Sequence, residues 1–208
     1  MNLNTFAPRQ TVVTSEAQGL PRLEKGARVV VIGAGCFGGW AALWLRRQGM
    51  NVTLVDAWGA GNSRSSSGDE TRVIRSTYGG NETYFDLNVR ALELWKEHQS
   101  LFGKQVFFNQ GVLWLCYQEQ TPVVDDSVPF ALRHGVPYEY LSAQELAQRY
   151  PIIRSNDLHH AYLDRTGGFL KARESAAAVQ ELFVREGGSY IQAQVRAPQP
   201  GKNWKAFY

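Results

Sequence analysis

Three glycines stand at a spacing that can hold a phosphate-bearing ligand. They are Gly33, Gly35 and Gly38, in the segment Gly-Ala-Gly-Cys-Phe-Gly. Between a strand and a helix, the first glycine permits a tight turn, the second lets backbone approach a pyrophosphate, and the third lets the helix pack closely on the sheet. The anion then lies against free amides at the positive end of the helix dipole. On their own these residues fit an ordinary turn equally well, so the elements around them decide.

Those elements fit a dinucleotide-binding unit. Residues 28–32 predict a strand buried on both faces, residues 36–48 predict a helix with one apolar face, and residues 51–55 predict a second strand. The second strand ends at Asp56, 23 positions after Gly33 (56 − 33), close to the spacing of about 20 that places a carboxylate on ribose hydroxyls. An acid here argues against a cofactor with a 2′-phosphate. The spacing does not separate NAD from FAD.

A second group of residues able to do chemistry follows a serine-rich loop. The loop covers residues 59–68, and the segment Asp-Glu-Thr-Arg72-Val-Ile-Arg75 comes directly after it. A guanidinium is permanently charged and can grip a carboxylate through two parallel hydrogen bonds. Arg72 and Arg75 are therefore candidate binding groups. The residues alone favour another interpretation, in which both arginines lie on a solvated helix face and pair with the two acids before them.

The rest of the chain alternates helices and strands. Asn109-Gln-Gly111 predicts a hairpin between two strands, and Ser142-Ala-Gln-Glu145 has the spacing of a capping box. The order β-α-β, an insertion, then helix and strand predicts one α/β nucleotide domain interrupted by a smaller domain. The further helices are predicted over residues 84–102, 123–134, 142–150 and 171–186, and the further strands over residues 105–108, 112–117 and 189–195.

The segment from Gly68 to Gly79 resembles a motif of the amine- and amino-acid-oxidising flavoproteins of the D-amino acid oxidase superfamily. It looks most like the monomeric sarcosine oxidase branch, whose members include N-methyl amino acid, pipecolate and fructosyl-amine oxidases. The resemblance covers roughly residues 27 to 195, and Thr71-Arg72…Arg75 is its specific part, since many families share the glycine fingerprint. Further similar segments are Gly111-Val-Leu-Trp-Leu115, Leu141 to Pro151 and Gly167-Gly-Phe-Leu170.

The resemblance implies an α/β fold: an FAD-binding, Rossmann-like parallel sheet of the glutathione-reductase type with an inserted α+β substrate domain. Family members are close to twice as long, so both domains are expected to be incomplete at the C-terminus and the chain to be a truncated form. The expected parts are a flexible leader (1–26), the FAD-binding domain in two segments (27–103 and 166–196), a partial substrate domain (104–165) and an atypical tail (197–208).

The resemblance also implies roles for individual residues. Arg72 matches a residue beside the isoalloxazine ring, where its charge can stabilise reduced, anionic flavin, and Arg75 matches a residue that clamps the substrate carboxylate. These two are the predicted catalytic residues. The predicted cofactor-binding residues are Gly33, Gly35, Gly38 and Asp56 for the ADP part of FAD, Ser65 and Ser66 for its phosphates, and Thr71 and Arg72 for the flavin.

The activity implied is oxidation of a C–N bond of an amine or N-alkyl amino acid. A hydride passes to the flavin, and molecular oxygen takes up the electrons to give hydrogen peroxide. Ser66-Ser67 stand where sarcosine oxidases proper carry histidines, so the substrate need not be sarcosine. Two alternatives stay open: a non-catalytic fragment or subunit that needs a second chain, and an NAD-dependent dehydrogenase.

The amino-acid composition limits the kinds of molecule that this chain is expected to bind. Apolar residues make up 44% of the chain and charged residues 20%, as in a globular protein with a core, and a net charge of +3 without a basic run excludes nucleic acid. Cys36, Cys116 and His159-His160 lack metal-ligand spacing, so no metal is expected, and a reducing cytoplasm is the expected location. No apolar run approaches the ~20 residues of a membrane helix. An unclosed sheet predicts self-association through exposed strand edges.

Overall fold

The computed structural model describes residues 23–196, so most of the predicted leader and the whole predicted tail lie outside the described residues. The strands are β1 (Arg28–Ile32), β2 (Asn51–Asp56), β3 (Thr71–Ile74), β4 (Phe107–Phe108), β5 (Val112–Cys116), β6 (Tyr138–Ser142), β7 (His160–Asp164), β8 (Gly168–Lys171) and β9 (Ser189–Gln192). The helices are α1 (Cys36–Arg47), α2 (Glu82–His98), the short 3-10 helix η2 (Gln99–Phe102), α3 (Pro122–Asp125), α4 (Val128–His134), α5 (Ala143–Arg149) and α6 (Ala172–Arg185).

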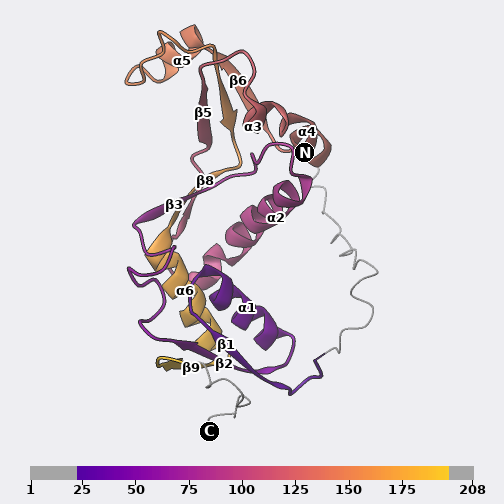
Figure 1. Ribbon diagram of the computed structural model, residues 1–208, viewed down its shortest axis with the longest axis vertical. Helices are drawn as coiled ribbons and strands as arrows, with labels where there is room; N and C mark the ends of the chain where they lie inside the picture. The colour runs from indigo at the N-terminus through magenta and orange to yellow at the C-terminus, as the bar shows by residue number, and fades with distance from the viewer. Residues whose placement is uncertain (1–22, 197–208) are drawn as a thin grey trace.

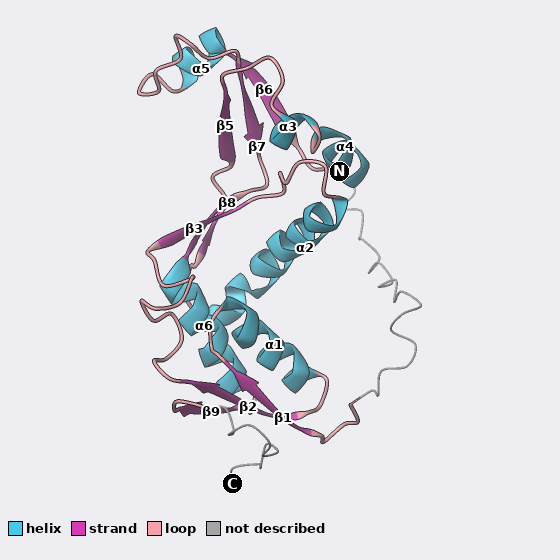
Figure 2. Ribbon diagram, viewed as in Figure 1, coloured by secondary structure: helices cyan, strands magenta, loops and turns pink. Residues whose placement is uncertain are grey.

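A parallel sheet of β1, β2 and β9 forms one end of an elongated molecule (Figure 1). The strand order is β1-β2-β9, and both pairings are parallel. Helices α1 and α6 lie on one face of this sheet (Figure 2). The alternate residues Val52 and Leu54 of β2 point to that face and are buried in the main apolar core. The predicted α/β fold class with a parallel sheet is therefore confirmed.

The opposite face of the parallel sheet is open. Val30, Ile32 and Ile191 lie on it and are 63%, 59% and 50% exposed, because no described helix covers them. Soluble proteins rarely leave a contiguous apolar patch uncovered unless it binds something. Within residues 23–196, no helix is both long and apolar enough to cross a membrane.

Two antiparallel sheets carry the remaining strands. One has the order β3-β8-β4 and the other β5-β7-β6. The predicted hairpin through residues 109–111 is wrong, because β4 pairs with β8 and β5 pairs with β7. Gly111, at φ +78°, donates its N–H to the Gly167 carbonyl at 3.1 Å, and the chain crosses there from one sheet to the other.

Among the other local predictions, one is confirmed and one is wrong. The capping box is confirmed: Ser142 Oγ accepts from the Glu145 N–H at 3.2 Å, and Glu145 accepts from the Ser142 N–H at 2.8 Å. The single helix predicted over residues 123–134 is instead two helices, α3 and α4. Pro129 lacks an amide hydrogen and cannot donate to the preceding turn, which breaks the run. Strands β3, β6, β7 and β8 were not predicted from their sequences.

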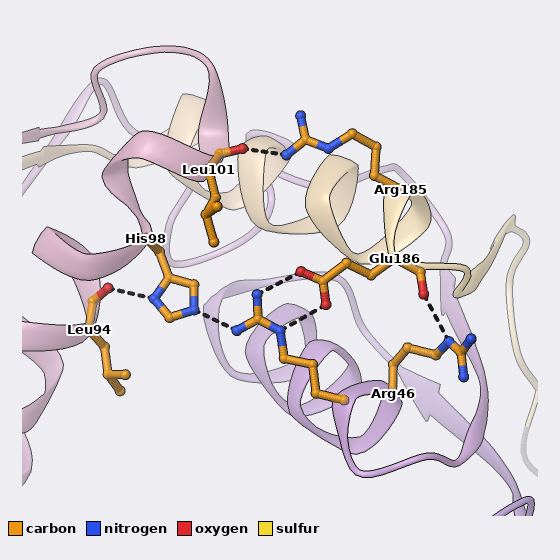
Figure 3. A network of polar contacts seen from close by, with 7 residues as sticks. Arg46, Leu94, His98, Leu101, Arg185 and Glu186 are labelled. Carbon is orange, nitrogen blue, oxygen red and sulfur yellow. Dashed lines mark hydrogen bonds and ion pairs between the residues drawn. The ribbon is translucent and has the colours of Figure 1, made fainter. Parts of the chain in front are cut away.

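A polar network ties α1, α2 and the C-terminal end of α6 together (Figure 3). Arg47 binds Glu186 through two hydrogen bonds, Nε to Oε2 at 2.8 Å and Nη2 to Oε1 at 2.6 Å. Arg47 Nη1 also lies 2.6 Å from His98 Nε2, and His98 Nδ1 lies 2.8 Å from the Leu94 carbonyl. Because a carbonyl only accepts and a guanidinium only donates, the imidazole carries its proton on Nδ1.

We expect the ion pair of Arg47 with Glu186 to make part of the free energy of unfolding sensitive to acid. The hydrogen bond from Arg47 lowers the pKa of Glu186 below its ordinary value of 4.5. A carboxyl group whose pKa is lower in the folded than in the unfolded state stabilises the fold at pH values above its unfolded-state pKa. This stabilisation is lost as the pH falls through the folded-state pKa. Glu186→Gln should therefore lower the free energy of unfolding by about 1 kcal/mol near pH 7, because the pair is partly exposed.

The measurement is thermal unfolding of the protein and of Glu186→Gln from pH 7 to pH 3. The difference between them should shrink as pH falls below 4.5, the ordinary value for this carboxyl. Glu119→Gln, at an exposed acid without this network, is the matched control and should differ little from the parent at any pH. A constant difference for Glu186→Gln across this range would contradict the assignment.

Candidate functional site

The glycine turn between β1 and α1 has the shape that its spacing predicts. Gly33 adopts φ +102°, a conformation that other residues rarely adopt, and its N–H donates to the Val55 carbonyl at 2.7 Å. A Cβ on Gly38 would lie 1.8 Å from the Gly33 carbonyl oxygen, so only glycine fits there. A Cβ on Gly35 would meet nothing within 4 Å. The backbone therefore leaves open space over Gly35, where a ligand can approach it.

Asp56 lies at the end of β2, against this turn. Its Oδ2 accepts from the Ala34 N–H at 2.8 Å, and its Oδ1 accepts from the N–H groups of Trp58 and Gly59 at 2.8 and 2.9 Å. The carboxylate thus holds the turn in place. Tyr190 of β9 lies nearby, and burial, followed by the charge of Asp56, raises the pKa of its phenol. Binding of a ribose by Asp56 stays a prediction.

A cavity of about 640 Å³ opens beside the turn. It lies between the N-terminus of α1, the serine-rich loop, strands β3 and β8, and one side of α6. Its volume is in the range of small-molecule and cofactor sites. Of the predicted site residues, Gly33, Gly35, Gly38, Ser66 and Arg72 line it. Lining residues that the sequence did not single out as site residues include Trp40, Ser67, Tyr78 and Ser175.

Small residues explain how α6 reaches the cavity. Ala172 and Ala176 line it from one stripe of α6, and a Cβ on Gly39 of α1 would lie 3.3 Å from a methyl of Val179. The first turn of α1 therefore approaches the middle of α6 closely. An alanine stripe on a helix that follows a glycine fingerprint is a sequence signal that could have indicated this wall.

Arg72 points to the cavity from β3. It is paired across the sheet with Leu170, and it donates to the Ser66 carbonyl at 3.0 Å from Nε and 2.6 Å from Nη2. Its Nη1 forms an ion pair with Asp69 at 2.5 Å, as the alternative interpretation expected, but Thr71–Ile74 is a strand and the helix face is wrong. The Arg72 side chain is 49% exposed, and exposed ion pairs contribute little, so its charge is available to a ligand.

Four predicted site residues do not line the cavity: Asp56, Ser65, Thr71 and Arg75. Successive side chains of a strand point to opposite faces, so Thr71 lies on the other face of the sheet from Arg72. Ser65 turns into its own loop, where its hydroxyl donates to the Asn62 carbonyl at 2.9 Å. Ser67 lines the cavity beside Ser66 in its place. Cofactor contacts of Thr71 and Ser65 stay predictions.

Arg75 lies just beyond the end of β3 and outside the cavity lining. Its guanidinium carbon lies 4.9 Å from the ring centroid of Tyr78 and 5.2 Å from that of Trp114. Tyr78 itself lines the cavity, so Arg75 is one side chain away from it. Among the described residues, no hydrogen bond or ion pair involves Arg75, and its Nε is buried without a partner.

A buried carboxylate fixes the backbone next to Arg75. Asp164 Oδ2 accepts from the N–H and hydroxyl of Ser76 at 2.8 and 2.7 Å. Its Oδ1 accepts from the N–H and hydroxyl of Thr166 at 2.9 and 2.8 Å and from the Gly167 N–H at 3.2 Å. Sequence reasoning missed Asp164, although an Asp two residues before Thr and three before Gly is typical of a side-chain-capped turn.

The electrostatics of the cavity favour an anion. The first turn of α1 has no acidic residue and no side-chain cap, so its amides and the positive end of the helix dipole face the cavity. Arg72 adds a cation on the opposite wall. Within the described chain, no group of three or more His, Cys, Asp or Glu side chains could hold a metal ion. The arrangement can bind a phosphate-bearing ligand along the open backbone at Gly35.

Two glycine variants separate folding from binding. Gly38→Ala would force a methyl against the Gly33 carbonyl, and it should destabilise the fold by about 1–3 kcal/mol. Gly35→Ala meets no atom of the protein but fills the space a phosphate would take, so it should unfold near the parent temperature. Its affinity for FAD should fall by roughly tenfold or more, equivalent to about 1.4 kcal/mol.

Thermal unfolding and FAD titration of the two variants provide the measurement. Each variant serves as the control for the other, since both add one methyl group to the same turn. Unaltered FAD affinity in Gly35→Ala would remove the open backbone from the ligand site.

Comparison with known proteins agrees with this geometry. Residues 28–206 match the DAO family, described as FAD dependent oxidoreductase. The chain is 28% identical, over 81% of its length, to monomeric sarcosine oxidase of an Arthrobacter species, and the match covers 43% of that protein. It is 31% identical, over 79% of its length, to peroxisomal sarcosine oxidase of Mus musculus, and the match covers 42% of that protein. The matched part of this chain therefore spans less than half the length of these curated relatives. The structure of L-proline dehydrogenase from P. horikoshii shares the fold, with a TM-score of 0.68 and 22% identity over 82% of this chain and 45% of that one. The family resemblance predicted from the motifs is confirmed: the chain belongs to the DAO family of FAD-dependent oxidoreductases.

Proposed function

We propose that this protein binds FAD and takes part in the oxidation of a C–N bond of an amine or N-alkyl amino acid. The observation that carries the proposal is the single cavity that joins the glycine turn at Gly35 to the cation Arg72, with Arg75 lying behind its wall. One end suits a pyrophosphate, and the other offers positive charge where reduced flavin and a substrate carboxylate need it.

The residues present fit FAD. The open space over Gly35 and the uncapped amides of α1 suit its pyrophosphate, and Asp56 stands at the strand end where an acid holds the ribose. Ser66 and Ser67 follow the cavity from the loop, and Ser65 and Thr71 lie next to lining residues. Membership of an FAD-dependent family favours FAD over the NAD alternative.

When bound, FAD supplies the hydride acceptor for the carbon beside the amine nitrogen, and oxygen takes the electrons on to hydrogen peroxide. The chain's own residues bind and orient. Arg72, held by the Ser66 carbonyl, places a permanent positive charge at the cavity wall and stabilises an anionic ring system. Arg75 binds the substrate carboxylate and so orients the reacting carbon.

The substrate class rests on the relatives. Those reported above are named for sarcosine, an N-methyl amino acid, and others are named N-methyl-L-tryptophan oxidase. Because the chain spans less than half of their length, catalysis by this chain alone, its acceptor and its substrate are parts of the proposal.

The open sheet face supports a second candidate function. A chain with Val30, Ile32 and Ile191 exposed on one sheet face fits a non-catalytic fragment, or a subunit that needs a second chain to cover that face. Light scattering separates the two: a monodisperse monomer that oxidises an amine excludes this candidate, and self-association without FAD uptake supports it.

The activity test uses the full chain with added FAD and a series of N-methyl amino acids. Retained visible flavin absorption and amine-dependent peroxide formation are expected. Arg75→Met should lower kcat/KM for these substrates by roughly tenfold to a hundredfold, because a hydrogen bond to a charged group is worth about 1.5–3 kcal/mol. Arg64→Met, at an exposed arginine that also stacks on an aromatic ring, is the matched control and should leave kcat/KM unchanged. A protein that stays colourless with added FAD would refute the proposal.

A further inference from the structure

Two aromatic rings from distant parts of the chain hold the guanidinium of Arg75. We call Tyr78 and Trp114 the aromatic clamp. Tyr78 comes from the loop after β3 and Trp114 from β5, and their ring centroids lie 4.9 and 5.2 Å from the Arg75 guanidinium carbon. Planar guanidinium groups stack on aromatic faces. Contacts on its faces leave the edge of a guanidinium, where its N–H groups point, to make hydrogen bonds.

No acid of the described chain neutralises this cation. The buried acid tied to the next residue, Ser76, is Asp164, and five donors already occupy its two oxygens. The charge of Arg75 is thus partly buried and balanced only by the rings. A partly buried cation without a counter-ion is costly, and an anionic ligand would remove that cost.

The Trp114 side chain packs against a small buried core on the β5-β7-β6 sheet. Its cross-strand neighbour on β7 is Tyr162, which is buried, and both pack with Cys116 and Val124 in a small core beneath α3. The indole Nε1 is buried without a hydrogen-bond partner, as is Arg75 Nε. Buried donors of native proteins almost always have partners, so two such donors on touching side chains point to a missing acceptor.

We propose that Trp114 is a specificity-determining residue of the carboxylate site. The aromatic clamp fixes the plane of Arg75, so that its edge meets a carboxylate in a bidentate geometry beside the cavity, and the indole N–H offers a further donor there. This inference rests on the proposed function, because it takes Arg75 as the group that receives the substrate carboxylate. It adds that Trp114 sets the preference for a carboxylate by positioning Arg75.

The test observes the Arg75 side chain directly, in the full chain labelled with ¹⁵N. The Arg75 Nε–H signal is identified by its loss in Arg75→Lys. It should be shifted upfield by ring currents from the clamp. Sodium propionate should move it in a saturable manner, whereas propionamide, of the same shape but uncharged, should not.

Trp114→Leu removes one ring and the indole donor. The upfield shift should largely vanish, and propionate should bind roughly tenfold more weakly, as loss of a desolvated cation–π contact near 1.4 kcal/mol implies. Trp114→Phe keeps a ring face and should retain most of the shift, which guards against a fold lost in the leucine variant. Trp58→Leu removes the ring of the exposed Arg64 stack and should change neither the Arg75 signal nor propionate affinity.

Two results would overturn the inference: an Arg75 signal that propionate does not move, or a Trp114→Leu variant with unchanged signal and affinity. Neither readout requires flavin or turnover. Propionate binding at Arg75 in a protein unable to take up FAD would refute the proposed function and leave the clamped carboxylate site standing. Amine oxidation by a protein whose Arg75 signal does not respond to propionate would support the proposed function and refute this inference.

Discussion

The buried carboxylate of Asp164 connects the parts of this molecule that meet at the candidate site. It lies at the end of β7, accepts from Ser76 just after β3, and caps the turn that leads into β8. An isolated buried carboxylate costs many kcal/mol, and five donors make it tolerable. Because Ser76 lies 88 positions before Asp164, whereas Thr166 and Gly167 lie within three residues of it, the two antiparallel sheets must keep a fixed relation for all five hydrogen bonds to form. The direction in which the chain leaves β3, and so the place of Arg75, follows from that constraint.

The local parts of the fold were readable from sequence because their causes lie within a few residues. The glycine turn depends on the conformation of Gly33 and the missing Cβ of Gly38, and the capping box on Ser142 and Glu145. The strands that escaped prediction, such as β3 and β8, are four residues long, and their partner lies about a hundred positions away. The false hairpin has the same cause: turn residues at 109–111 were visible, but the strand that β4 prefers was not.

The candidate site likewise has a local part that was predicted from the sequence and a part that depends on distant residues. The residues around Gly35 and Asp56 were predicted from their spacing and from the strands and helix around them, whereas the aromatic clamp depends on contacts across the fold. Trp114 stands in a segment that was predicted as a strand and noted for its similarity to the family, without a role for its side chain. Its contact with Arg75 spans two different sheets, and no periodicity in the sequence encodes it.

The two arginines of the family motif have different surroundings because of where strand β3 ends. Arg72 lies inside β3, where alternation turns it to the cavity and turns Thr71 away. By the same alternation a longer strand would keep Arg72 and Arg75 on opposite faces. Instead β3 ends at Ile74, and Asp164 holds Ser76, so Arg75 leaves the sheet and meets Tyr78 and Trp114. The end of one short strand thus gives two nearby cations different surroundings: Arg72 lines the cavity, and Arg75 stacks on two aromatic rings, where we propose that it receives a carboxylate.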